Sequence, residues 1–161
     1  CLGISDKTKK QKFYLNSFFP SSGSGFNTIT KDDYFWNLSR KMITFSPKKS
    51  FHEFDTNTTT LDEFCKLKKI NFIEILKIDT EGHELNVLNG NKKILKNTKI
   101  IKIEILDNKS KFEKKAKKIN SLLKKNNFHL LNNKKIHSVS IFSNLEARDY
   151  LYVNKSLLRT N

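Results

Sequence analysis

The architecture of this chain is clearest in one run of residues, Phe72-Ile73-Glu74-Ile75-Leu76-Lys77-Ile78-Asp79-Thr80-Glu81-Gly82-His83-Glu84. The run is largely apolar up to Ile78, which is typical of a strand buried on both faces of a parallel sheet. A helical pattern with Leu85 and Leu88 follows, and a second apolar run occupies Ile100–Leu106. Strand, helix and strand in this order predict a right-handed parallel βαβ unit and an α/β fold.

Helices are expected on both sides of this unit. Thr60-Leu61-Asp62-Glu63 has the form of a capping box, which predicts a helix from Leu61 to about Lys69. A second capping box, Ser110-x-x-Glu113, precedes a lysine-rich helix that extends to about Asn126. The apolar stripe of this helix consists of Phe112, Ala116, Ile119, Leu122 and Leu123. Its lysine face is interpreted as solvated surface.

The remaining segments complete a single predicted domain over residues 1–161. Strands are expected at Phe13–Phe18, Phe128–Leu131 and Tyr150–Val153, and a connection is expected around Ser138–Arg148. Residues 20–59 are predicted to be an irregular insertion or loop region, with one short helix around Tyr34–Lys41.

Composition sets broad limits on this domain. The chain is 37% hydrophobic and 29% charged, as expected for a folded soluble protein. Its two cysteines, Cys1 and Cys65, allow no disulfide framework and no zinc-type Cys-x-x-Cys spacing, and Cys65 is expected to be a small core residue. No signal-peptide pattern or membrane-length apolar run is present, so we expect a cytoplasmic location and no membrane partner. Because the chain opens on Cys1, we expect it to be entered midway.

The net charge of +15 raises the alternative of a basic nucleic-acid-binding module. The basic residues are, however, spread over most segments, few are Arg, and they do not alternate with aromatic residues. We therefore favour a compositional bias toward lysine over a nucleic-acid partner. A non-catalytic α/β remnant that only folds is a third alternative.

Candidate functional residues cluster after the first apolar strand. In an open parallel α/β sheet, ligands bind outside the carboxyl ends of the strands, which directs attention to Asp79, Glu81 and His83. An equally weighted alternative is that Asp79 and Thr80 cap the next helix, while Glu81 and Glu84 favour its positive end. For His83, an exposed or satisfied residue is favoured over a catalytic base.

Glu104 and Asp107 lie in and just after the second strand, so they are candidates for the same edge of the sheet. A carboxylate within an apolar strand is costly unless it is paired or functional, and Lys77 is the expected partner of Glu104. No glycine-rich phosphate loop or nucleophile elbow is present, and no residue demands a metal ion.

Two motifs carry a resemblance to a known family. Thr60-Leu61-Asp62 and then Lys77-Ile78-Asp79-Thr80-Glu81-Gly82-His83-Glu84 resemble the Thr-Leu-Asp and Lys-Ile-Asp-x-Glu-Gly-x-Glu segments of FkbM-type methyltransferases. The similarity extends over about residues 60–155, and Cys1–Asp6 resembles a small-residue segment further upstream in that family.

The resemblance implies a Rossmann-like sheet, mostly parallel with an antiparallel last strand, that is incomplete at its N-terminus. It implies S-adenosylmethionine as the methyl donor and O-methylation of a hydroxyl acceptor, often on a sugar or other small molecule. The family's glycine-rich first turn and the acidic residue that holds the cofactor ribose would lie before Cys1. Asp79 is then the first candidate for proton removal or positioning, Glu81 the second and His83 the third, with Glu104 and Asp107 as substrate-binding candidates.

Overall fold

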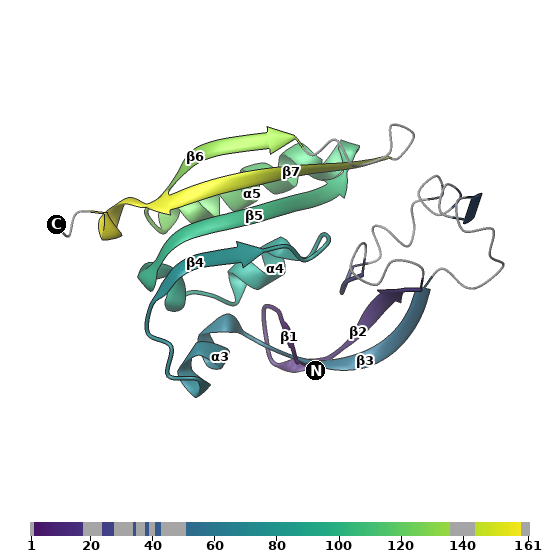
Figure 1. The fold of residues 1–161 in the computed structure, drawn as a ribbon, viewed down its shortest axis with the longest axis horizontal. Coiled ribbons are helices and arrows are strands. Elements are labelled where there is room, and N and C mark those ends of the chain that lie inside the picture. Colours follow the sequence, from purple (N-terminus) through teal and green to yellow (C-terminus); the bar gives the residue numbers. More distant parts are fainter. Residues whose placement is uncertain are drawn as a thin grey trace.

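A computed structural model describes residues 2–17, 24–27, 34, 38, 41–42, 51–135 and 144–158. They form a larger and a smaller sheet, with helices packed against the larger one (Figure 1). None of the helices in these ranges combines the length and the apolar content needed to cross a membrane.

The larger sheet contains the predicted βαβ unit. Strand β4 (Ile73–Ile78) leads into helix α4 (Glu84–Asn89) and the short 3-10 helix η1 (Ile94–Asn97). Strand β5 (Thr98–Asn108) then lies parallel to β4, in a register that places Ile78 beside Ile103. The prediction of an α/β fold built on this unit is confirmed.

The rest of the larger sheet is antiparallel. Helix α5 (Lys109–Lys125) is followed by β6 (Phe128–Lys135), β7 (Leu145–Asn154) and the 3-10 helix η2 (Lys155–Leu157). The strand order is β4-β5-β7-β6, and β7 runs against both of its neighbours. Among the described strands of this sheet, one pair, β4–β5, is parallel and the other two are antiparallel, so the prediction of a mostly parallel sheet is wrong. The reason is that β7 lies between β5 and β6 and makes both remaining pairs antiparallel.

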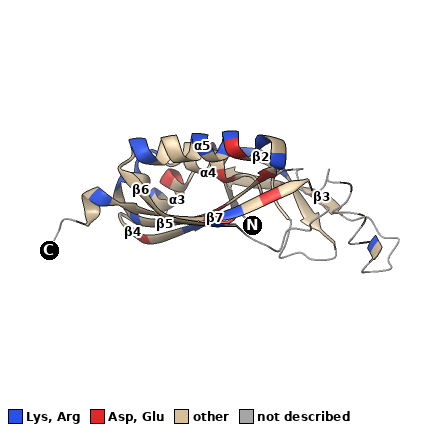
Figure 2. Cartoon of the chain, turned by 90° about the horizontal axis from the view of Figure 1, so that it is seen from above, with Lys and Arg blue, Asp and Glu red and all other residues tan. Residues whose placement is uncertain are grey.

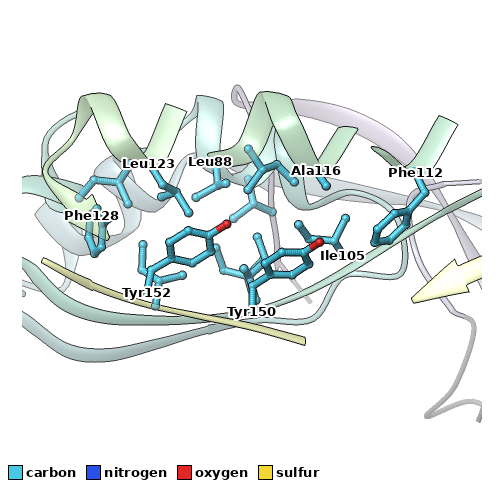
Figure 3. Close-up of a cluster of buried hydrophobic side chains, with 14 residues drawn as sticks. Leu88, Ile105, Phe112, Ala116, Leu123, Phe128, Tyr150 and Tyr152 are labelled. Atoms are coloured by element: carbon cyan, nitrogen blue, oxygen red, sulfur yellow. The ribbon is translucent and has the colours of Figure 1, made fainter. Parts of the chain in front are cut away.

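The main core lies between one face of this sheet and helices α4 and α5. Alternate β5 residues Ile101, Ile103 and Ile105 are fully buried there. Figure 3 shows Tyr150 and Tyr152 of β7 extending from the sheet toward the apolar stripe of α5. The predicted stripe of this helix is confirmed, because Phe112, Ala116, Ile119 and Leu123 all belong to the cluster, with Leu122 packed against it.

The opposite face of β4 is open. Figure 2 shows α4 and α5 on the same side of the larger sheet, with lysines along the outer surface of α5. On the other side Ile75 is 64% exposed, and Lys77 is exposed as well. The prediction that this strand is buried on both faces is therefore wrong. In the described part of the chain, β4 is an edge strand with helices against only one of its faces.

The smaller sheet has the order β1-β3-β2, built from β1 (Leu2–Ile4), β2 (Lys9–Asn16) and β3 (Phe51–Thr59). Strand β3 pairs parallel with β1 and antiparallel with β2. Irregular structure was expected up to residue 59, and this is wrong for residues 51–59, because pairing with two strands stabilises a segment that shows no clear periodicity of its own. Three described residues of the expected short helix, Tyr34, Leu38 and Lys41, are helical, and so is Met42 just beyond it. The other residues of that prediction lie outside the described ranges.

The two predicted capping boxes have different outcomes. Thr60 caps α3 (Leu61–Leu67): its hydroxyl accepts from the N–H of Glu63, and the Glu63 carboxylate accepts from the N–H of Thr60. Helix α5 instead begins one residue before Ser110, with Asn108 as the N-cap and no side-chain cap hydrogen bond. Ser110 thus lies inside the helix, and the second capping box is wrong.

Candidate functional site

Three carboxylates form a row across the sheet, at the carboxyl end of β4, in the carboxyl-terminal half of β5 and on β7. The β4–β5 register places Asp79 level with Glu104, and Glu104 is paired directly with Asp149 of β7. Because side chains alternate along a strand, all three belong to the sheet face opposite Ile103 and α5. The structure thus brings Asp79 and Glu104 together as predicted, and it adds Asp149.

Lysines of the neighbouring row pair with the two outer carboxylates. Lys77 Nζ lies 2.8 Å from Asp79 Oδ2, and Lys102 Nζ lies 3.5 Å from Asp149 Oδ2. The expected Lys77–Glu104 ion pair is therefore wrong, because Asp79 lies two residues away on the same face of the chain and takes the ammonium group.

Glu104 is left as the central carboxyl group of the row. Burial, and after it the negative charges of Asp79, Glu81 and Asp149, raise its pKa to about 7. A carboxyl group with a pKa near neutrality can exchange a proton at physiological pH. The edge of the sheet therefore contains one group suited to proton transfer, surrounded by other carboxylates.

The turn after β4 has an unusual backbone. Glu81 has a φ of 48° and Gly82 a φ of 99°, so two successive residues are in the left-handed region. Helix α4 starts only at Glu84, and its N-cap is His83. The alternative that Asp79 and Thr80 cap this helix is thus wrong, because the turn separates both residues from the helix start. Glu84 acts there instead, accepting the N–H of Gly82 at 2.6 Å.

His83 lies inside the protein, 4% exposed. Its Nε2 atom is 2.9 Å from the hydroxyl of Ser5, which itself donates to Asp6 Oδ1 at 3.0 Å. Burial lowers the pKa of His83 to about 4. A buried imidazole that is neutral at pH 7 and already hydrogen-bonded has poor access to a substrate proton, so this geometry supports the interpretation of a satisfied residue.

Asp107 lies apart from the row. It is three positions beyond Glu104 on β5, so it belongs to the opposite face of the sheet, and its Oδ1 accepts from the N–H of Asn108 at 2.8 Å. Within the described ranges, no group of three or more His, Cys, Asp and Glu side chains is arranged to hold a metal ion.

Two residues near this edge, Asp149 and Lys115, were not predicted from the sequence. Asp149 gave a weak signal, as a carboxylate next to an apolar strand. That it lies beside Glu104 follows only from the β5–β7 register, which the sequence does not show. Lys115 gave a stronger signal, because it lies three residues after Phe112 and four before Ile119 and so falls within the apolar stripe of α5. It is 9% exposed, unlike the lysines around it.

A shallow pocket adjoins the row on the open face. It is lined by Lys102, Asn132, Lys134, Asp149, Tyr150 and Leu151. Its lining combines ammonium, amide and carboxylate groups with apolar side chains, which can offer both hydrogen bonds and apolar contact to a small polar molecule.

The segments that carry the family resemblance meet in space. Ser5 contacts His83, and Asn91 Oδ1, just beyond Gly90, accepts the N–H of Leu61 at 3.2 Å. Asp62 accepts the N–H groups of Lys93 and Ile94 at the start of η1. The sequence motifs thus form one connected region.

This is an α/β domain with a carboxylate site at the carboxyl ends of its parallel strands, and comparison with known proteins identifies its family. Residues 1–130 match the Methyltransferase FkbM domain, so the chain belongs to the FkbM methyltransferase family. The match includes the whole smaller sheet and ends within β6. No curated protein and no solved structure matches the chain.

Proposed function

We propose that this domain transfers a methyl group from S-adenosylmethionine to a hydroxyl group of a sugar or another small polar molecule. The row Asp79–Glu104–Asp149 carries this proposal, since it lies at the carboxyl ends of the parallel strands of a methyltransferase-family domain. The adjacent pocket, with its amide and charged groups beside Leu151, supports an acceptor rich in hydroxyl groups.

The charge of the row supports the choice of methyl donor. The pKa of Glu104 is raised first by burial and then by the neighbouring carboxylates, and a positively charged ligand would relieve the repulsion among these carboxylates. A sulfonium group carries such a charge, so Asp79, Glu81 and Glu104 are the residues proposed to face it. When bound, S-adenosylmethionine supplies the methyl group, whose bond to sulfur breaks as its bond to the acceptor oxygen forms.

The residues of the row would orient the acceptor and take up its proton. Methyl transfer requires the acceptor oxygen to be aligned with the donor carbon and its hydroxyl proton to be removed. Asp79 is proposed to hold or deprotonate the hydroxyl, with Glu81 as the second candidate. Glu104 is proposed to bind the acceptor, and its pKa allows it to share the released proton.

Binding of the donor tests the proposal first. Isothermal titration of the full-length, folded protein with S-adenosylmethionine should show saturable binding. A folded protein that releases no heat of binding, and that transfers no methyl group to any of a panel of sugars, would contradict the proposed function.

Asp79→Asn tests the site. We expect turnover to fall by roughly 100- to 10,000-fold, because the substitution removes the carboxylate that accepts or polarises the hydroxyl proton. The dissociation constant of S-adenosylmethionine should change far less. Turnover is measured at saturating donor and acceptor, and a rate within about threefold of the parent would remove Asp79 from the catalytic residues.

The chain offers a matched control for this substitution. Glu74 is also an exposed carboxylate of β4 in an ion pair, 2.8 Å from Lys99, but it lies at the opposite end of the strand. Glu74→Gln should leave turnover at the parent value. A similar loss in both variants would indicate a general effect of charge on this strand rather than chemistry at its carboxyl end.

A further inference from the structure

Lys115 extends from α5 to the carboxyl ends of both parallel strands. Its Nζ lies 2.7 Å from Glu84 Oε2, and it donates to the carbonyl oxygens of Gly82 at 2.7 Å and Leu106 at 2.8 Å. Two of the three ammonium protons are thus used in hydrogen bonds, and the carboxylate is in ion-pair contact. Glu84 is fully buried and Lys115 nearly so, which makes this a desolvated ion pair.

The contacts hold the turn that follows β4. The Glu84 carboxylate accepts the N–H of Gly82 through Oε1, while Lys115 donates to the carbonyl of the same residue. A second donor, Asn27 Nδ2, lies 2.6 Å from that carbonyl. Both polar backbone groups of Gly82 are thus engaged, which stabilises the left-handed conformation of Glu81 and Gly82.

The same ammonium group links the two strands that carry the site. The turn begins directly after Asp79 and contains Glu81, whereas Leu106 is two residues beyond Glu104 on β5. Lys115 therefore connects the turn to β5, and its length sets the distance between the turn and Glu104. It does so without a described contact to any carboxylate of the row.

We propose that Lys115, acting together with Glu84, is a positioning residue that holds the Asp79–Gly82 turn in place relative to Glu104. This inference rests on the proposed function of the row. The competing interpretation is that the ion pair only stabilises the interior. The two differ in a testable way, because a buried ion pair can often be replaced by neutral residues without loss of stability.

The test is the double variant Glu84→Gln/Lys115→Met. The introduced glutamine keeps an oxygen for the N–H of Gly82, and the introduced methionine fills the space of the lysine stem, while the links to the Gly82 and Leu106 carbonyls are lost. Glu84 is one of the carboxylates that raise the pKa of Glu104, so loss of its charge lowers that pKa even if the turn stays in place. The single variant Glu84→Gln measures this part, because Lys115 keeps its hydrogen bonds to Gly82 and Leu106. Lys118→Met is the matched control, since Lys118 lies on the same helix but is exposed.

Two readouts separate positioning from simple stability. The first is the split between turnover and donor affinity: we expect turnover of the double variant to fall roughly 100-fold, as small misplacements of reacting groups do, with little change in affinity for S-adenosylmethionine. The second, independent of activity, is the pKa of Glu104 measured by carboxyl NMR. Release of the turn moves Asp79 and Glu81 away, so this pKa should fall below its value in Glu84→Gln, while burial, the largest cause of the raised value, and Asp149 keep it above 4.5.

The outcomes are decisive in each case. A folded double variant with parental turnover and a Glu104 pKa equal to that of Glu84→Gln overturns the proposal, and so does a double variant that cannot fold, since the pair is then structural. If the parent transfers no methyl group, the proposed function fails, whereas the Glu104 titration still decides whether Lys115 positions the turn. Lys118→Met should match the parent in both readouts.

Discussion

Tyr152 carries a hydroxyl group into the most buried part of the core. The residue is 0% exposed, and its hydroxyl has no hydrogen-bond partner among the described residues. Its ring is stacked near that of Tyr150, with centroids 6.2 Å apart (Figure 3). Burial raises the pKa of Tyr152. A buried polar group without a partner lowers the free energy of unfolding.

Tyr152→Phe should therefore stabilise the protein, by about 1 kcal/mol, because the ring remains while the unpaired hydroxyl is removed. Urea unfolding measures the change. Tyr150→Phe is the matched control: Tyr150 makes a side-chain hydrogen bond with Arg148, so the same substitution there should destabilise. A loss of stability in Tyr152→Phe would show that its hydroxyl has a partner.

The contact between the end of α4 and the loop after β1 depends on the absence of a side chain at Gly90. A Cβ atom placed there would lie 2.3 Å from the carbonyl oxygen of Ser5 and 3.2 Å from Asp6 Cα. Both are backbone atoms, so the loop would have to move as a unit. The same loop supplies the hydroxyl group that contacts His83.

Gly90→Ala should lower the free energy of unfolding by roughly 1–3 kcal/mol, since the added methyl group overpacks a close backbone contact. It should also raise the pKa of His83 from about 4 toward 6.5, as displacement of Ser5 admits water to the imidazole. Denaturant unfolding and histidine NMR titration measure the two effects. Asn89→Ala, at an exposed neighbouring position, should show neither.

At the scale of the whole molecule, Glu104 and His83 give opposite contributions to the pH dependence of stability. Glu104 has a raised pKa in the folded protein, so its contribution is fully present below 4.5 and is lost as the pH rises to about 7. His83 has a lowered pKa, so its contribution is present above 6.5 and is lost as the pH falls to about 4. Between about pH 4.5 and pH 6.5, the stability lost at Glu104 as the pH rises is largely offset by the stability gained at His83.

Glu104→Gln should break this balance. The variant should be more stable than the parent at about pH 8, by on the order of 1 kcal/mol or more, and equally stable at about pH 4.5, because the cost of ionising Glu104 is removed only where it is ionised. Urea unfolding at both pH values provides the measurement. An equal stability difference at the two values would contradict the raised pKa.

Local patterns in the sequence predicted the parts of this fold that depend on near neighbours. The β4–α4–β5 order, the apolar stripe of α5 and the capping box at Thr60 are all confirmed. Each of these features depends on contacts within a few residues, where periodicity and capping chemistry are visible. The motif from Lys77 to Glu84, together with the Thr60–Asp62 segment, was likewise sufficient to indicate the family.

The tertiary structure alone decided which of these residues meet. The row Asp79–Glu104–Asp149 depends on the register of β4, β5 and β7, and the partner of Lys77 depends on which carboxylate shares its face. Lys115 is buried because acceptors from two segments, the one that follows β4 and the end of β5, converge on it. Register and convergence are set by long-range packing, which compensates for the desolvation of charged groups that a sequence pattern places on the surface.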